Sequence, residues 1–340
     1  MKWMENFLIG RKQRVVIDGV ESDECDVASG VPQGSVLGPL LFIIFINDIG
    51  AQLSPGTKIR LFADDSLVYR VIESHEDEVA FQSDLDKLTA WADAWCMSFN
   101  VDKCYAMHFM NRGRKSREVA VPYTMKGQQL ERVEHTKYLG ITLMDTLGWS
   151  IQTSQACGKA HASLAFLERN LWMLPRNLKE RAYFTIVRPA LEYGSAVADP
   201  YFAKDVAKLD GVQRHAARFV TGNPRRRYDP ESERVSVSQL LDELKWESLQ
   251  SRRQTARCIL LFKVLKDLIA VSDDLKPAPS AHGRALRSGT AGNLPHMRAK
   301  NEHFNNSFFP RTIRDWNSLP AAAKTAEELE EFKTKISQKP

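Results

Sequence analysis

Along the first 146 residues, the pattern of apolar and polar positions predicts β-strands before and after one long helix. Two stretches rich in apolar and β-branched residues, 58–63 and 66–72, flank a tight acidic turn, a pattern typical of a β-hairpin. Apolar side chains then recur at intervals of three and four over residues 75–95, which predicts a helix. Further strands are expected near residues 97–100, 104–109, 119–125, 128–133 and 137–143.

From residue 149 onward the apolar period becomes that of an α-helix. Ala160 and Leu164 share one face of the first of these helices, and Pro175 is expected to end it. Gly222 is a typical signal for the C-terminal end of another helix. Further helices are expected over residues 178–187, 203–221, 245–270, 310–319 and 327–336.

An apolar run, Leu40–Ile46, follows a segment rich in glycine and proline at residues 29–39. The run is apolar on every side but shorter than the ~20 residues of a bilayer span, so we expect a helix buried in a protein core. Pro39 fits the first turn of this helix, and Asp48 is expected to have a structural role where it ends. Because no longer apolar run occurs, we expect no membrane partner.

Asp64 and Asp65 stand side by side in the acidic turn between the two expected strands. Adjacent carboxylates repel each other, so such a turn is favoured when a cation neutralises them. Mg²⁺ takes oxygen ligands and keeps part of its coordination shell for phosphates and water, which suits phosphoryl transfer by two metal ions. A solvated surface turn is the alternative interpretation of the same two residues.

Two motifs, found in a fixed order, carry a specific resemblance. Residues 30–39 read GVPQGSVLGP, and residues 62–65 read FADD. Together they resemble the palm of reverse transcriptases from non-LTR retrotransposons of the jockey-like LINE type. Other segments that resemble the same elements are residues 91–103, 138–141, 188–195, 212–214, 216–219 and 308–312. The resemblance therefore extends over nearly the whole chain.

The resemblance implies an α+β fold in which residues 1–146 form a partial polymerase palm, an antiparallel sheet with packed helices. Residues 147–270 are then expected as an all-helical thumb, 271–303 as a flexible linker, and 304–340 as a short helical C-terminal segment. It also implies an RNA-directed DNA polymerase, a nucleotidyltransferase with Mg²⁺ at a two-metal site. The expected partners are an RNA template, a DNA primer and deoxynucleoside triphosphates (dNTPs).

The same resemblance implies roles for single residues near the acidic turn. Asp64 is expected to bind both metal ions, while Asp65 supports the site electrostatically or binds metal at times. Gln33 and Gly34 are expected where the templating base meets the incoming nucleotide, because a small backbone leaves room for the base pair. Ala63 is small, which keeps the primer end close to Asp64.

Two further segments carry implied roles. Lys103 closes an Asn-x-x-Lys motif and is expected as a general acid towards the leaving pyrophosphate. A salt bridge with Asp102 or another carboxylate is the alternative interpretation of Lys103. The segment Tyr138-Leu139-Gly140 resembles the short hairpin that grips the end of the primer.

In the polymerases that this chain resembles, a strand bearing another Asp precedes the glycine-rich motif and shares the metals. We find no such strand and expect the chain to lack it, to lack the nucleotide-binding fingers, and to be catalytically incomplete. Asp18-Gly19 is better interpreted as a hairpin turn between residues 13–17 and a strand near 26–28 than as a metal site. A non-catalytic nucleic-acid-binding remnant is the alternative function.

The chain is mildly basic, with a net charge of +5, which permits nucleic-acid binding without requiring it. Arg225, Arg226 and Arg227 are expected on the nucleic-acid backbone, with a solvated face as the alternative. The five cysteines lack Cys-x-x-Cys spacing, which argues against structural zinc and favours a reducing intracellular compartment, nucleus or cytoplasm. An open palm is also expected to associate through exposed apolar surface.

Overall fold

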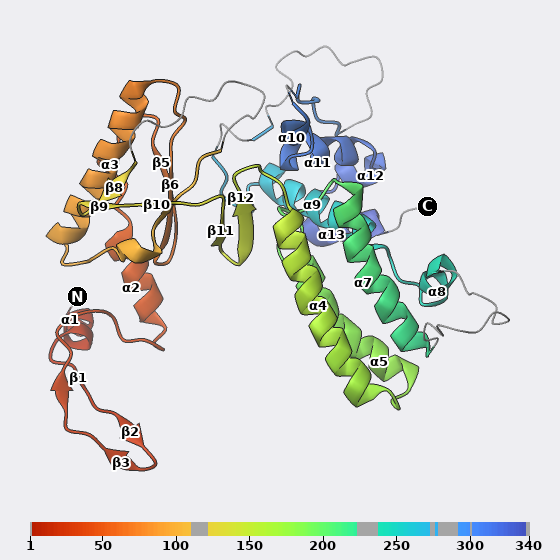
Figure 1. Cartoon of the computed structure of the whole chain (residues 1–340), viewed down its shortest axis with the longest axis horizontal. Coiled ribbons are helices and arrows are strands. Elements are labelled where there is room, and N and C mark those ends of the chain that lie inside the picture. Colours follow the sequence, from red (N-terminus) through yellow and green to blue (C-terminus); the bar gives the residue numbers. More distant parts are fainter. Residues whose placement is uncertain are drawn as a thin grey trace. The chain divides into compact units, whose positions relative to one another are not determined.

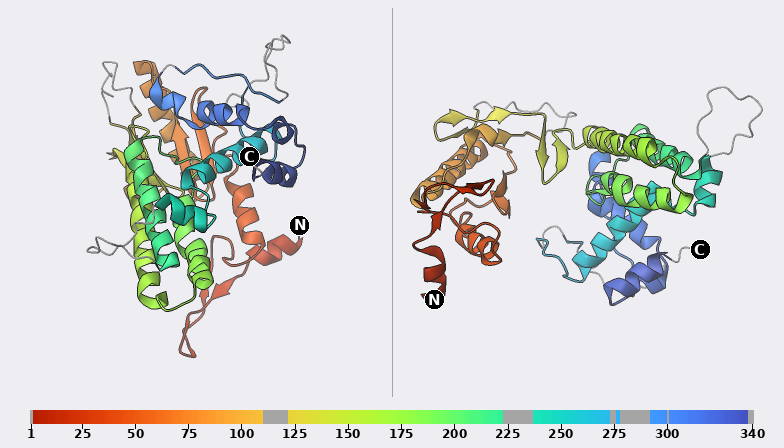
Figure 2. Two further views of the ribbon diagram at one scale, coloured as in Figure 1. Left: turned by 90° about the vertical axis from the view of Figure 1, so that its right-hand side faces the viewer. Right: turned by 90° about the horizontal axis from the view of Figure 1, so that it is seen from below.

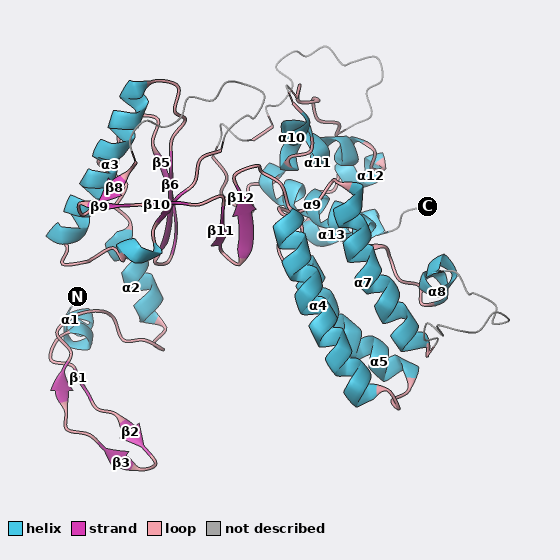
Figure 3. Cartoon of the chain, viewed as in Figure 1, coloured by secondary structure: helices cyan, strands magenta, loops and turns pink. Residues whose placement is uncertain are grey.

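The computed structural model describes residues 2–109, 122–222, 237–272, 276–277, 292–299 and 301–337. Their contacts divide them into two compact units. Of the described residues, unit 1 holds 2–106 and 122–133, and unit 2 holds 107–109 and those from 134 onward. Helices and strands are mixed in unit 1, whereas unit 2 consists of helices and one hairpin (Figure 3). The expected α+β class is therefore confirmed.

Unit 1 contains three α-helices, one 3₁₀ turn and ten short strands among the described residues (Figure 1). They are α1 (Lys2–Leu8), β1 (Lys12–Gln13), β2 (Val16–Ile17), β3 (Val20–Glu21), β4 (Cys25–Asp26), α2 (Leu37–Ile46), β5 (Lys58–Phe62), β6 (Asp65–Tyr69), α3 (His75–Ala94), the 3₁₀ turn η1 (Val101–Lys103), β7 (Tyr105–Ala106), β8 (Thr124–Met125), β9 (Gln128–Gln129) and β10 (Glu131–Arg132). The strand expected over 97–100 is not formed.

The strands of unit 1 pair two by two, and the single antiparallel sheet that we expected is not formed among the described residues. Four of the pairs are antiparallel, but β7 and β10 pair in parallel. The expectation went wrong because alternation of apolar and polar residues identifies strands without saying which strands become neighbours. Only hairpin pairs are fixed locally, through the turn that joins them.

Helix α3 forms where the sequence predicts it and organises the core of unit 1. Ser74 and Asp77 close a capping box at its first turn, because each side chain accepts the backbone N–H of the other residue. The buried face of α3, which includes Leu85, Leu88 and Trp91, packs against apolar residues of the β5–β6 hairpin, the segment after α2 and β8. The hairpin lies alongside the helix (Figure 1).

Helix α2 is formed as predicted, but the expectation that all its sides are buried is wrong, because one side is exposed in the structure. Leu40, Ile43 and Ile44 are 53, 55 and 64% exposed. The end of the helix is held in the core by Ile46, which is buried. The all-apolar sequence shows that each face of α2 can be buried, but which face is covered depends on neighbours that composition does not specify.

Unit 2 is built from one hairpin and a series of helices (Figure 2). Its elements are β11 (His135–Tyr138), β12 (Ile141–Met144), α4 (Ser150–Leu171), α5 (Arg176–Ala182), the π-helical turn η2 (Tyr183–Val187), α6 (Arg188–Glu192), α7 (Ala203–Thr221), α8 (Val237–Glu243), α9 (Leu249–Leu265), α10 (Glu302–Asn305), α11 (Phe308–Asn317), α12 (Ala321–Lys324) and α13 (Leu329–Ser337). The predicted end of α7 is confirmed, because Gly222 adopts the left-handed conformation at its C-terminus.

Unit 2 has two apolar cores that share helix α9. The first core combines α4 to α8 with Leu249 at the start of α9, and the second combines Cys258 and later residues of α9 with α11 to α13. Residues 292–294, inside the segment expected as a linker, are also tied to this second core: the Trp316 indole donates to the carbonyl of Gly292 at 2.9 Å.

A buried ionic cluster lies where the two cores meet along α9. Arg253 and Arg257, one helical turn apart on α9, both contact the carboxylate of Asp199, and all three side chains are almost fully buried. Arg257 also pairs with Asp315 of α11, and Nη1 of Arg311 lies 3.3 Å from Oδ2 of Asp199. The cluster therefore connects the segment before α7 with α9 and α11.

Candidate functional site

The acidic motif lies at the tip of the β5–β6 hairpin, as the sequence predicts. The register pairs Phe62 with Asp65, so Ala63 and Asp64 form the two-residue turn and Asp65 begins β6. The turn lies one residue earlier than the predicted Asp64-Asp65 turn, because strand propensity alone does not fix the register of a hairpin. Ala63 has φ +51°, a left-handed conformation that costs an alanine about 1 kcal/mol. Asp64 and Asp65 are exposed side chains. The tip of the hairpin therefore presents both carboxylates to solvent.

The base of this hairpin is fixed to α3 by Arg70, which follows β6. Its guanidinium donates to Asp77 at 2.9 Å and to the carbonyl of Pro55 at 2.9 Å, and it also reaches the hydroxyl of Thr57. The Arg70 hydrogen bond is the main reason that the pKa of Asp77 is lowered. Both ends of the hairpin are thereby joined to the first turn of α3.

A second anchor holds the segment before β5. Asp84 of α3 is fully buried and accepts hydrogen bonds from the backbone N–H and hydroxyl of Ser54, at 3.0 and 2.8 Å, and from the Lys87 ammonium at 2.8 Å. Burial by itself raises the pKa of Asp84, but the hydrogen bonds from Lys87, Thr57 and Ser54 outweigh it and lower that pKa to about 2. Asp84 therefore remains ionised inside the unit.

Sequence reasoning missed these two anchors, although each left a signal. Ser74 and Asp77 have the spacing of a capping box. Asp84 falls on the apolar stripe of α3, three residues after Phe81 and four before Leu88, where an unpaired carboxylate would be costly. An acidic residue on a buried face requires partners, but the sequence does not show which ones.

Asp64 and Asp65 fit one half of a two-metal site. Exposed carboxylate oxygens in an adjacent pair are suitable ligands for Mg²⁺, which is commonly held by one or two carboxylates and substrate phosphates. Among the described residues, no group of three or more His, Cys, Asp or Glu side chains is placed to hold a metal ion. The donors present therefore suit magnesium but supply only part of its binding site.

The glycine-rich loop presents Gln33 and Gly34 to solvent at the start of α2. Ser35 fixes the loop, because its hydroxyl donates to the carbonyl of Pro32 at 2.7 Å and accepts the N–H of Gly38 at 3.0 Å. Neither Gln33 nor Gly34 hydrogen-bonds to the acidic pair within the part of the chain that the structure describes.

Lys103 and Asp18 were both considered as site residues, and the structure places them in different surroundings. Lys103 is exposed on η1, and within the described ranges it forms no ion pair; the carboxylate of Asp102 accepts instead from Gln128 at 3.0 Å. Asp18-Gly19 is a hairpin turn, with φ +51° and +82°, as predicted. Its returning strand was misplaced, however: β3 pairs with β2, and β4 pairs with β1.

The segment expected to grip the primer forms a tight turn in unit 2. Tyr138 pairs with Ile141, and Leu139 and Gly140 form the turn between β11 and β12. Tyr193, after α6, donates its hydroxyl proton to the carbonyl of Leu139 at 2.9 Å. Sequence reasoning missed this contact, although both segments belong to the same resemblance.

The tight fit of this turn depends on glycine. A Cβ added at Gly140 would lie 3.0 Å from the Tyr193 ring, and one at Gly194 would lie 2.4 Å from Cδ1 of Ile141. Both glycines have positive φ, so the two motifs interlock at positions where other residues are disfavoured. Arg225, Arg226 and Arg227 lie outside the described residues.

The described part of the chain contains no helix that is long and apolar enough to cross a membrane.

Comparison with known proteins shows what this chain is similar to. Residues 1–143 match the family described as reverse transcriptase (RNA-dependent DNA polymerase). The chain is 30% identical over 235 residues to an RNA-directed DNA polymerase from mobile element jockey of Drosophila melanogaster, covering 65% of this chain and 25% of that protein. The corresponding jockey protein of Drosophila funebris is 31% identical over 236 residues, with the same shares covered.

A third relative extends the similarity beyond jockey. A probable RNA-directed DNA polymerase from transposon X-element of Drosophila melanogaster is 27% identical over 229 residues, covering 64% of this chain and 24% of that protein. The chain thus spans about a quarter of the length of these curated relatives. Its first 143 residues belong to the reverse transcriptase family, in the jockey-like group from non-LTR retrotransposons.

Proposed function

We propose that the chain contributes the acidic hairpin, the glycine-rich loop and a nucleic-acid-holding helical unit to RNA-directed DNA synthesis by a retrotransposon. The observation that carries the proposal is the exposure of Asp64 and Asp65 at the tip of the β5–β6 hairpin. The base of this hairpin is held against α3 by hydrogen bonds of Arg70 and Asp84. Substrates and partners are an RNA template, a DNA primer and dNTPs.

Each residue near the hairpin has one role in this proposal. Asp64 and Asp65 provide oxygen ligands for Mg²⁺, which when bound stabilises the negative charge of the transferring phosphate. The small Ala63 leaves space for the primer end beside Asp64. Gln33 and Gly34 border the position of the nascent base pair, and the Ser35 hydrogen bonds hold their loop in place.

Lys103 is proposed to protonate the leaving pyrophosphate. Its side chain is exposed, and no carboxylate of the described residues pairs with it, so the ammonium is free to approach a phosphate. The turn Tyr138-Leu139-Gly140 is proposed to hold the primer end. Residues 1–146 would then act as palm, 147–270 as thumb, 271–303 as linker and 304–340 as an accessory helical segment.

A non-catalytic nucleic-acid-binding role is the second candidate. One observation favours it: the described residues bring no third metal-binding side chain to Asp64 and Asp65. Two-metal transfer needs ligands on both sides of the metal pair, since one side stabilises the attacking oxygen and the other the leaving group. The first candidate therefore requires a carboxylate from outside the described structure.

Primer extension on a primed RNA template, with Mg²⁺ and dNTPs, separates the two candidates. We expect no extension by the 340-residue chain alone, and extension when a segment bearing the Asp strand of a jockey-like polymerase is supplied. Asp64→Asn should then reduce the rate by several powers of ten, whereas Asp93→Asn, an exposed position on α3, should not.

Extension by the supplemented protein that Asp64→Asn leaves unchanged would contradict the catalytic proposal. Robust extension by the chain alone that is lost in Asp18→Asn would instead contradict the expected incompleteness, because Asp18 would then complete the site in place of the supplied strand.

A further inference from the structure

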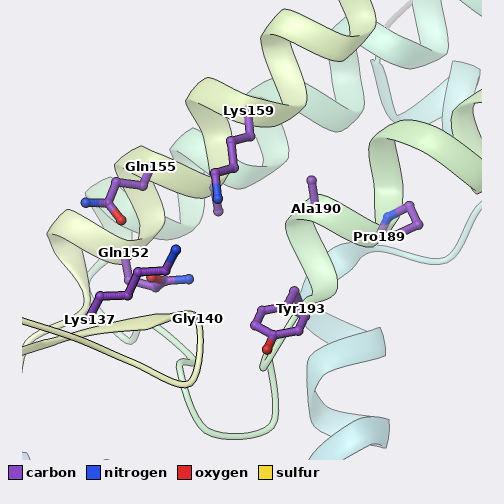
Figure 4. A pocket seen from close by; sticks show the side chains of 9 residues that line it. Lys137, Gly140, Gln152, Gln155, Lys159, Pro189, Ala190 and Tyr193 are labelled. Carbon is purple, nitrogen blue, oxygen red and sulfur yellow. The ribbon is translucent and has the colours of Figure 1, made fainter. Parts of the chain in front are cut away.

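A pocket of about 370 Å³ in unit 2 belongs to the site already described. Its wall includes Gly140, of the turn that is proposed to hold the primer end, together with Lys137 and Tyr193 (Figure 4). A second feature, the extended ribbon of residues 12–26 in unit 1, has no role in that site.

Every residue of the ribbon is exposed. Strand β1 pairs with β4 and β2 pairs with β3, and among the described residues no third strand joins either pair. The ribbon extends away from α2 and α3 of the same unit (Figure 1). Because two strands alone are marginally stable in water, such a ribbon gains from pairing with a further strand.

Strand β2 has one paired edge and one open edge. The N–H of Ser22 donates to the carbonyl of Val15 at 2.9 Å, and Ile17 pairs with Val20 next to the turn. In an antiparallel pair, successive residues direct their N–H and C=O groups alternately towards the partner strand and away from it. Since Val15 and Ile17 face β3, Val16 directs its N–H and C=O groups to the open edge.

The apolar side chains of this hairpin gather on one face. Val15, Ile17 and Val20 point to the same side, because side chains alternate along a strand and Val20 lies opposite Ile17. They are 61, 68 and 73% exposed. On the other face, Arg14 forms an ion pair with Glu21 at 2.6 Å. The hairpin is therefore amphipathic, but its apolar face is uncovered.

The charges along the open edge are complementary to a second copy of the same strand. Residues 14–18 read RVVID, with a cation at one end, a carboxylate at the other and apolar residues between them. An antiparallel pair centred on Val16 places Arg14 of one copy opposite Asp18 of the other. Both side chains are exposed, and no cation of the described residues pairs with Asp18. Charges usually keep an edge strand single, but these two favour a copy of themselves.

We propose that the open edge of β2 pairs with the same edge of a second copy, which gives a four-stranded antiparallel sheet with a two-fold axis at Val16. This axis is perpendicular to the sheet, so the apolar side chains of both copies share one face. An overlap of five residues is small beside the ~800 Å² per partner of a standard interface, so the dimer is weak and reversible. It requires neither metal nor nucleic acid and is independent of the proposed role in DNA synthesis.

Sedimentation velocity of the full chain at concentrations up to about 0.1 mM, without Mg²⁺ or nucleic acid, tests the proposal. The parent and all variants carry Ile44→Asp, which reduces association through the exposed face of α2. Arg14→Glu and Asp18→Lys should each raise the dissociation constant of the dimer by about tenfold, because two attractions per dimer become two repulsions. Lys2→Glu makes the same change of charge as Arg14→Glu on exposed α1 and should have little effect.

An equimolar mixture of the two charge variants guards against misfolding. One copy with Arg14→Glu and one with Asp18→Lys again carry opposite charges at both contacts, so the dissociation constant should return to within about threefold of the parent value. Hydrogen exchange of the peptide that contains Val16 should slow with rising concentration in the parent and in the mixture.

Three results would overturn the proposal: no concentration-dependent association of the parent, equal dissociation constants for the charge variants and Lys2→Glu, or a mixture that associates as weakly as the single variants. Association that Val20→Asp abolishes but both charge variants leave intact would also overturn it, because the apolar face and not the strand edge would then be the contact.

Discussion

Replacing Asp84 by Asn should destabilise unit 1 without touching the acidic pair. Asp84 is fully buried and is the shared acceptor for Ser54 and Lys87, which lie on the segment before β5 and on α3. Asparagine keeps one acceptor oxygen for Ser54 but removes the charge that stabilises the Lys87 ammonium. The hairpin that carries Asp64 should then be held less firmly at its base.

The magnitude follows from the pKa of Asp84, which is lowered from 3.8 to about 2. Each unit corresponds to about 1.4 kcal/mol, so the ionised carboxylate contributes about 2 kcal/mol to the folding of unit 1. Because the folded-state pKa lies below the unfolded one, this contribution is complete above about pH 5. It is lost as the pH falls through 3.8 towards 2.

Urea unfolding combined with hydrogen exchange on peptides from α3 measures this effect within unit 1. Asp84→Asn should lower the free energy of unfolding by about 2 kcal/mol at pH 7 and flatten its pH dependence between pH 4 and 2. Asp93→Asn, at an exposed position of the same helix, is the matched control. A loss below about 0.5 kcal/mol, or an unchanged pH dependence, would refute the assignment.

Two further predictions concern other parts of the molecule. Asp199→Ala leaves Arg253 and Arg257 buried without their carboxylate, so unit 2 should lose roughly 3–5 kcal/mol in urea unfolding. The exposed Asp242→Ala on α8 should cost little, and a loss below about 1 kcal/mol for Asp199→Ala would contradict the prediction. The exposed apolar face of α2 should cause association in light scattering. Ile44→Asp should reduce that association more than Val79→Asp on α3, and equal effects would argue for another surface.

Local signals in the sequence determined the elements whose formation depends on neighbouring residues. The apolar period of α3, the left-handed Gly222 after α7 and the tight turn at Asp18-Gly19 were predicted, because turn and cap geometry is set within a few residues. The acidic turn was predicted to within one residue. The motifs likewise indicated the family, since their order along the chain needs no tertiary information.

The position of the hairpin 135–144 was decided by tertiary structure. Its contacts place it in unit 2, where Tyr193 and Gly194 interlock with Leu139 and Ile141. No period or turn signal predicts such a contact, because it joins residues more than fifty positions apart. The pocket that this contact helps to line was therefore invisible in the sequence.

Burial and pairing were likewise decided by the fold. The sequence marks α2 as apolar but not which of its faces is covered, since coverage depends on the neighbours that the fold supplies. Charged residues such as Asp84 and Asp199 lie in the core because lysine and arginine partners from other turns and helices reach them. The sequence thus determined which elements form and to which family they belong, whereas tertiary contacts decided how these elements hold the site.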